Sequence, residues 1–256
     1  MNYTTSQISK QSRFIHRTID TQVGEERHQF DQGVSIPAYL EETYWWAYVR
    51  PYAIAFFDHE WIVNLILLGN MAKLRDQALD ALGSSIHGRT LQIASVYGDF
   101  SARLVERMAE GGSLDIVDVV PAQLENLHRK LSASAPVRLL QRDSTSLSKV
   151  EDATYDQVVL FFLLHEMPAN VRERTLSEAL RVLKPGGKLV IVDFHKPSAL
   201  NPFRYLYPPM FRLLEPFALD TWNQHIEDWL PKDFVPTAVN KGTVFGGLYQ
   251  RVVISR

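Results

Sequence analysis

TLQIASVYGDFS, residues 90–101 of this 256-residue chain, reads as a strand, a tight turn and the start of a helix. Leu91 and Ile93 alternate with other residues as in a short buried strand, and Gly98 ends that pattern. A helix over 101–109 follows, with its apolar residues on one face. Such a unit leaves backbone N–H groups free at the helix start, so we expect an anion-binding site there.

The turn in this stretch lacks most of its expected glycines. Loops in which the backbone approaches a nucleotide closely usually carry three glycines. Gly98 keeps one of these positions, while Ala94 and Val96 occupy the other two and Tyr97 adds a bulky ring. The turn is therefore chemically unusual for a nucleotide-binding loop.

Strands and helices alternate after this unit. We predict strands over 113–119, 137–141, 157–164 and 188–194, and helices over 121–131 and 169–183. The alternation predicts a parallel α/β sheet whose ligand lies at the carboxyl ends of the strands. A closing hairpin is expected from strands over 234–239 and 243–254, with a turn or bulge at Gly246 and Gly247.

Composition excludes several classes of site. The formal charge of -2 and the pI near 6.4 argue against a nucleic-acid partner, because such surfaces are normally basic. The absence of cysteine excludes disulfides, zinc–cysteine sites and thiol catalysis, and it is compatible with a cytoplasmic protein. Residues 1–33 are polar and mixed in charge, so we expect a flexible arm without a signal peptide.

Two segments are rich in aromatic residues. Residues 34–85 predict an N-terminal helical cap, whose apolar run is too short to span a bilayer because Asp58, His59 and Glu60 interrupt it. Its aromatic rings pack in the core, or they face a membrane interface. Both are compatible if one face of the helices is buried and the other is exposed. Residues 197–230 predict a hydrophobic insert after the fifth strand, either a substrate-binding lid or a segment packed against the cap.

Carboxylates end two of the predicted strands. Asp118 ends the second strand, about twenty residues after the first loop. A carboxylate at this spacing accepts hydrogen bonds from a ribose diol, and the alternative is that it caps the start of the next helix. Asp143, followed by Ser144, ends the third strand. Its carboxylate accepts a hydrogen bond from the exocyclic amine of a base, or it caps the following turn.

Histidines follow the fourth and fifth strands. His165, next to Glu166, is expected to face the same crevice as a base, a metal ligand or a loop hydrogen-bonding group. Asp193 and His195 end the fifth strand, where we expect them to face solvent, with pocket lining as the alternative.

Four motifs carry a family resemblance: DVVPAQL at 118–124, RDS at 142–144, LHE at 164–166 and RVLKPGG at 181–187. In this order they resemble the motifs of class I S-adenosylmethionine (SAM) methyltransferases, with ubiquinone/menaquinone C-methyltransferases as the nearest common group. YLEETYWWAYVRPYAIAFF, WIVNLILLGN and VYGDFS more narrowly resemble RquA-type rhodoquinone-biosynthesis proteins.

The resemblance implies a Rossmann-like α/β fold, with a mainly parallel seven-stranded sheet and helices on both faces. It also implies conversion of ubiquinone to rhodoquinone, in which an amino group from SAM replaces a ring methoxy group with the help of manganese. We expect peripheral association with the inner membrane and leave the oligomeric state open. The alternatives are a SAM-dependent methyltransferase acting on a quinone or lipid, and a non-catalytic scaffold of a quinone-biosynthesis complex.

The predicted site follows from these motifs. We expect His165, Tyr97 and Asp143 to be catalytic, His165 being also the candidate metal ligand. The predicted cofactor-binding residues are Gln92, Ala94, Val96, Tyr97, Gly98, Asp99, Asp118, Val119, Asp143, Ser144 and Phe161. Gln92 stands where the family has an acidic residue that helps to hold the amino end of SAM. We hypothesise that losing this carboxylate leaves the amine a better nucleophile.

Overall fold

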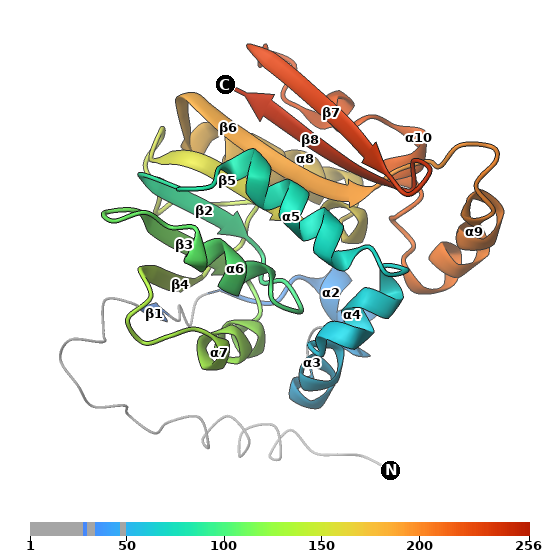
Figure 1. The fold of residues 1–256 in the computed structure, drawn as a ribbon, viewed down its shortest axis with the longest axis horizontal. Coiled ribbons are helices and arrows are strands. Elements are labelled where there is room, and N and C mark those ends of the chain that lie inside the picture. Colours follow the sequence, from blue (N-terminus) through green and yellow to red (C-terminus); the bar gives the residue numbers. More distant parts are fainter. Residues whose placement is uncertain (1–27, 30–33, 47–49) are drawn as a thin grey trace.

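A single sheet forms the centre of the molecule (Figure 1). The structure is a computed structural model that describes residues 28–29, 34–46 and 50–256. The predicted arm, residues 1–33, lies outside the described residues apart from the two-residue strand β1 (His28–Gln29). The other strands are β2 (Arg89–Ile93), β3 (Ser113–Asp118), β4 (Val137–Gln141), β5 (Tyr155–Phe161), β6 (Leu183–Phe194), β7 (Ala238–Val244) and β8 (Tyr249–Ser255).

The sheet is mainly parallel, which confirms the predicted fold class. Its seven main strands run in the order β4-β3-β2-β5-β6-β8-β7, and β1 pairs with β4 at one edge. The strands from β2 to β6 are parallel, whereas β8 runs antiparallel to both of its neighbours. The chain order reverses between β2 and β5, so the ligand crevice is expected where these two strands end.

Helices cover both faces of the sheet (Figure 1). Two separate groups of buried apolar side chains, one on each face, fill the space between sheet and helices. On one face lie α5 (Met71–Leu82), α6 (Phe100–Glu106) and α7 (Pro121–Lys130), and on the other lies α8 (Ala169–Val182).

Several predicted boundaries differ from the structure. The predicted helix 101–109 is α6, which ends at Glu106, and the predicted strand 234–239 is β7, which spans residues 238–244. The predicted strand 157–164 ends at Phe161, because Phe162 takes a φ of 54° and a short 3-10 helix, η3 (Leu164–Glu166), follows. The fifth predicted strand begins at residue 183 instead of 188, since the LKPGG run joins β6 through an irregular register with β5. The predicted strand 243–254 spans a turn, because residues 245–247 all have positive φ.

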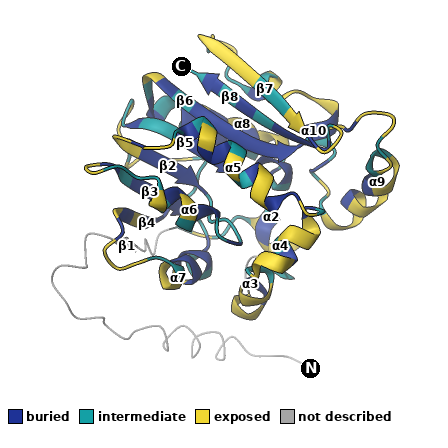
Figure 2. Ribbon diagram, in the orientation of Figure 1, coloured by how far each residue is buried: buried dark blue, intermediate teal, exposed yellow. Residues whose placement is uncertain are grey.

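The cap and the insert meet at one end of the sheet (Figure 1). The cap supplies α2 (Ala38–Thr43), α3 (Pro51–Phe57) and α4 (Glu60–Ile66), and the insert supplies α9 (Phe203–Leu214), α10 (Asp220–Asn223) and η4 (Ile226–Trp229). The cap helices have two kinds of face: Tyr44 and Ile54 are buried, whereas Tyr52 and Trp61 are exposed (Figure 2). No helix in the described part of the chain is both long and apolar enough to span a bilayer.

Candidate functional site

A cavity of about 830 Å³ lies at the carboxyl ends of β2, β3 and β5. Helices α2, α4 and α9 form its outer walls, mainly with apolar side chains: Tyr39, Leu40, Leu65, Ile66, Leu206, Tyr207, Met210, Phe211 and Leu214. Most of its polar groups lie at the strand ends and their loops, and Gln123 of α7 and Glu215 after α9 add two more. The cavity therefore combines a polar floor with a large apolar chamber, as a site for a ligand with a polar head and an apolar body requires.

Most of the predicted site residues line this cavity. They are Ala94, Val96, Tyr97, Asp118, Val119, Asp143, Ser144, Phe161 and His165. Gln92, Gly98 and Asp99 do not contribute to its walls. Asp99 instead pairs with Arg75 at 2.6 Å and with Arg103 at 3.0 Å, which turns its carboxylate away from the cavity.

Ala94 keeps the backbone path of the glycine that it replaces. Its φ is 70°, a left-handed conformation that is unfavourable for a residue with a Cβ atom. Gln92, fully buried below the loop, donates from Nε2 to the Ala94 carbonyl at 2.8 Å and to Ser101 Oγ at 2.9 Å. Within the described residues, Gln92 Oε1 has no hydrogen-bond partner. Gln92 therefore shapes the loop from beneath and does not contact the cavity directly.

The expected anion-binding site at the helix start is filled by the protein itself. Asp58, which follows α3, accepts the Gly98 N–H at 3.0 Å through Oδ1. The same carboxylate pairs with Lys130 at 2.7 Å and accepts from Asn126 at 3.0 Å. Lys130 also donates to the Gly98 carbonyl. The prediction of free N–H groups at this turn is wrong at Gly98, because a carboxylate from the cap occupies that donor.

Asp118, the predicted ribose-binding carboxylate, lies on the cavity wall at the end of β3. It accepts the Ser95 N–H at 2.7 Å and the Val120 N–H at 2.9 Å, so two backbone donors fix its orientation at the cavity wall. Burial raises the pKa of Asp118, and these hydrogen bonds oppose that rise. The nearby Val119 N–H and the Ser95 side chain also lower the pKa of Asp118.

Asp143 and Ser144 lie farther along the same floor. Asp143 Oδ1 accepts the Thr145 N–H at 2.8 Å, which is the turn-capping role considered for it, and the residue also lines the cavity. Ser144 Oγ is 3.0 Å from Thr175 Oγ1, a contact with α8. The turn-capping alternative for Asp143 is therefore confirmed, and its place on the cavity wall leaves the base-binding role as a prediction.

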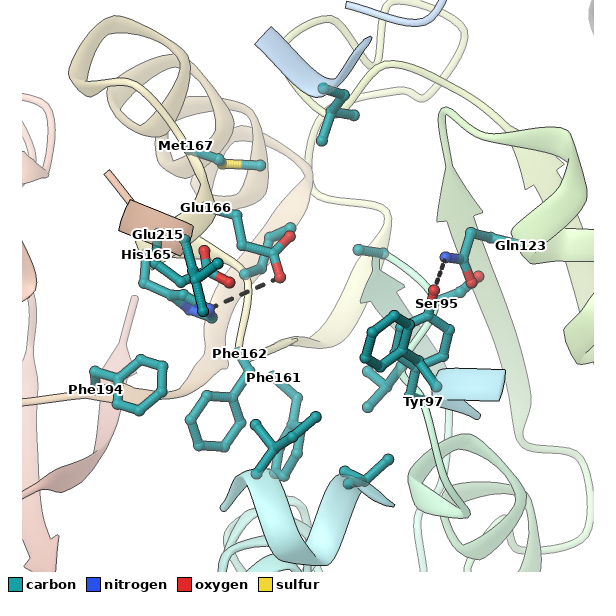
Figure 3. A pocket seen from close by; sticks show the side chains of 18 of the residues that line it. Ser95, Tyr97, Gln123, Phe161, Phe162, His165, Glu166, Met167, Phe194 and Glu215 are labelled. Atoms are coloured by element: carbon teal, nitrogen blue, oxygen red, sulfur yellow. Dashed lines mark hydrogen bonds and ion pairs between the residues drawn. The ribbon is translucent and has the colours of Figure 1, made fainter. Parts of the chain in front are cut away.

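His165, Glu166 and Glu215 lie together on the cavity wall opposite Tyr97 (Figure 3), and Asp193 contacts His165 from behind this wall. His165 Nδ1 lies 2.9 Å from Asp193 Oδ1, an ion-pair contact without the alignment of a hydrogen bond, and Nε2 lies 3.7 Å from Glu166 Oε1. Burial lowers the pKa of His165, but the nearby carboxylates outweigh it and raise that pKa to about 9, with Asp193 contributing most. His165 is therefore mainly an imidazolium at neutral pH and suits proton donation better than proton abstraction.

Asp193 corrects the expectation of a solvent-facing residue. It is fully buried and accepts the Leu164 N–H at 2.8 Å and the Phe194 N–H at 2.7 Å. These bonds tie the end of β6 to the loop that carries His165. His195 is half-buried, does not line the cavity, and its Nδ1 lies 2.8 Å from the Gly247 carbonyl.

The sequence interpretation missed Glu215. This residue follows α9, lines the cavity next to His165 and contacts the Tyr44 hydroxyl from the cap (Figure 3). Burial raises the pKa of Glu215, whereas His165 and Tyr44 oppose the rise. The signal that could have identified it is a lone acidic residue between Leu214 and Pro216 in an otherwise apolar stretch.

Arg172 supports the His165 loop from behind. Its guanidinium is fully buried, lies 4.1 Å from the centre of the Trp229 ring, and donates to the Leu164 carbonyl at 3.0 Å and to the Met167 carbonyl at 2.8 Å. Asp220 of α10 supplies its charge partner at 3.3 Å. The insert thus fixes the loop on which His165 lies.

The described residues do not fit the metal that the resemblance implies. No group of three His, Asp or Glu side chains among them is arranged to hold a metal ion. His165 has one ring nitrogen in contact with Asp193, which leaves only Nε2 for another partner. The residues do fit SAM, because a buried carboxylate and a strand-to-helix loop with a glycine-like bend lie together on the cavity floor.

Comparison with known proteins identifies the family. Residues 91–187 match the family described as "Methyltransferase domain". The chain is 31% identical over 155 residues to a demethylmenaquinone methyltransferase from Thermus thermophilus, covering 60% of this chain and 68% of that protein. It is 30% identical over 132 residues to the ubiquinone/menaquinone biosynthesis C-methyltransferase UbiE of Haemophilus ducreyi, covering 50% of this chain and only 49% of that relative.

Solved structures agree on the fold. An O-methyltransferase family protein from Burkholderia thailandensis superposes with a TM-score of 0.57 at 15% identity, covering 79% of this chain and 62% of that one. Such low identity shows the fold alone. Together with the Thermus relative, the sheet order and the match over residues 91–187, it establishes that this chain belongs to the class I SAM-dependent methyltransferase family, among the relatives of the quinone C-methyltransferases.

Proposed function

We propose that this protein is a SAM-dependent enzyme that converts ubiquinone to rhodoquinone by exchanging a ring methoxy group for an amino group. The observation that carries the proposal is the single cavity, which joins a nucleoside-type floor at Asp118 to an apolar chamber next to His165. The relatives are named for steps of ubiquinone and menaquinone biosynthesis, and this supports a quinone as the ring substrate.

The altered loop supports amino transfer over methyl transfer. In methyltransferases, the acidic residue at the position of Gln92 helps to hold the amino end of SAM. Here Gln92 is neutral and bonded to the loop, and Asp58 occupies the Gly98 N–H. The amino acid end of SAM therefore has fewer protein partners at this turn, which favours a position closer to the quinone ring.

SAM would supply the amine when bound, and the protein would orient it and handle the protons. Asp118 would accept from the ribose hydroxyls, and Asp143 would accept from the adenine amine. Replacement of methoxy by amino requires a bond from the SAM nitrogen to the ring carbon, loss of the methoxy oxygen as methanol, and cleavage of the bond between that nitrogen and the α-carbon of SAM. The methoxy oxygen would gain one proton and the attacking amine would lose one. The cleavage at the α-carbon would need one more proton at nitrogen, and we assign no residue to it. His165, protonated at neutral pH, would donate the first proton through Nε2 and regain it from the amine. Tyr97 would form the wall between nucleoside and ring, with its hydroxyl fixed by Gln123 at 2.9 Å.

Manganese belongs to the same resemblance, and we assign it no step. It enters the proposal as an assay condition, so the activity is measured with and without added manganese.

The second candidate is ring methylation of a quinone, which the names of the relatives favour. Product mass distinguishes the two. The protein is incubated with short-tail ubiquinone and SAM labelled at its amino nitrogen, and in parallel with demethylmenaquinone and SAM labelled at its methyl carbon. Labelled nitrogen in the ring product supports amino transfer, and label in a new ring methyl group shows methylation instead. SAM binding without either product would leave the scaffold alternative and refute both enzymatic proposals.

A further inference from the structure

The cavity opens between helices whose outer faces are apolar. Leu65 of α4 and Leu206 of α9 line the cavity, yet 66% and 61% of their respective surfaces are exposed. Other exposed apolar side chains lie on α3, α4 and α9. In Figures 1 and 2, α3 and α4 lie below the ends of the parallel strands and α9 lies to their right. We name this set the mouth surface: Tyr52, Phe56, Trp61, Leu65, Ile66, Tyr205, Leu206, Met210, Leu213 and Leu214.

This number of exposed apolar side chains around one cavity opening calls for a partner other than water. Isolated exposed apolar residues are normal on soluble proteins, but a patch formed by three helices marks an interaction site. The mouth surface includes Trp61, 63% exposed, and Tyr205, 64% exposed. Trp and Tyr are the side chains that favour the boundary between lipid tails and water.

The charges on these helices complement an anionic surface. In α3, α4 and α9, all of whose residues are described, the charged side chains are Glu60, Arg204 and Arg212. Arg50 precedes α3, and its guanidinium lies 4.4 Å from the centre of the Trp45 ring. The acidic residue that ends α3, Asp58, is neutralised by Lys130. On these three helices the arginines therefore outnumber the acidic side chains, although the whole chain carries a formal charge of -2 and α2, at the same end, adds Glu41 and Glu42.

We propose that the mouth surface docks on an anionic lipid bilayer, with the cavity opening toward the lipid. Apolar rings and aliphatic side chains would enter the interface while the arginines contact the headgroups. A polyprenylated quinone could then enter between α4 and α9 without crossing water. The inference extends the proposed function, since it concerns the route of the same substrate, and it implies peripheral attachment to the membrane.

Vesicle flotation tests the docking. The full chain is mixed with vesicles of phosphatidylcholine alone or with phosphatidylglycerol, and the floated fraction is measured. The test variant combines Trp61→Gln and Leu213→Gln, two exposed residues that do not line the cavity. The matched control is Val235→Gln, which is 83% exposed and lies just before β7. We expect the double variant to lose at least about tenfold in binding and the control to bind as the wild type does.

A charge variant separates the two contributions. Arg212→Gln should weaken binding to anionic vesicles about fivefold, and should leave binding to neutral vesicles unchanged. If the wild type does not float, or if the double variant floats equally well, the proposal is wrong. A third outcome also overturns the proposal. If the wild type self-associates, the double variant is a monomer, and both bind lipid equally, then the mouth surface is an interface between copies of the chain.

The docking proposal and the proposed function can fail separately. Amino transfer to a water-soluble short-tail ubiquinone needs no membrane, so it is measured without vesicles. The double variant should retain this activity and lose turnover only of long-tail ubiquinone in vesicles. Equal loss on both substrates would show that the variant damages the site and would refute a role in lipid docking.

Discussion

The pair of His165 and Asp193 makes a quantitative prediction about stability at alkaline pH. The folded protein holds the pKa of His165 at about 9, against 6.5 for an ordinary histidine. Because the folded-state pKa is the higher one, the pair stabilises the fold fully below about pH 6.5, and this stabilisation is lost as the pH rises through about 9. At about 1.4 kcal/mol per pH unit, the loss amounts to about 3 kcal/mol.

His165→Gln removes the titrating group and provides the test. Urea unfolding is measured for the wild type and the variant between about pH 6 and about pH 10. We expect the stability difference between the two proteins to shrink by about 3 kcal/mol over this range. His195→Gln is the matched control, because burial lowers the pKa of His195 and its titration therefore contributes no loss at high pH. A stability difference for His165→Gln that does not change with pH would show that Asp193 does not hold a charged imidazole.

Three further predictions concern the cofactor loop and floor. Asp118→Asn should weaken SAM binding about 10- to 100-fold in calorimetry, because the proposed ribose contacts are hydrogen bonds to a charged group, whereas unchanged affinity would exclude that role. Gln92→Asp should lower the amino-transfer rate, by about tenfold for each pH unit by which the new carboxylate raises the pKa of the SAM amine; a native rate would refute the hypothesis for Gln92. Ala94→Gly should raise stability by about 1 kcal/mol in urea unfolding, because relief of the left-handed strain exceeds the entropy cost of glycine, and a destabilised variant would contradict this.

The sheet and its strand-end carboxylates could be predicted because they depend on local pattern. Strand 137–141 was predicted with the bounds that β4 has, and Asp118 and Asp143 lie on the cavity as expected of residues that end neighbouring parallel strands. Such residues lie together in any fold of this topology. No knowledge of side-chain packing is needed to place them.

The contacts made by the cap and the insert could not be predicted in this way. Asp58 reaches Gly98 across 40 residues, and Glu215 reaches His165 only because α9 folds back over the strand ends. Sequence spacing does not show which distant segments fold back against each other. Asp193 was assigned to solvent because a strand-end carboxylate usually faces it, yet three backbone N–H donors and His165 stabilise its charge in the interior.

The loop shows how a cofactor site can keep its shape while its chemistry changes. Ala94 retains the bend of a glycine at the cost of strain, so the path of the backbone past Asp118 is preserved. The donors and charge around that path are different: Gln92 is neutral, and Asp58 bonds the Gly98 N–H. Asp58 also belongs to the cap whose outer face forms part of the mouth surface. The contacts of Asp58 with Gly98 and Lys130 therefore join the cap to the loop and to α7, across 40 and 72 residues of sequence.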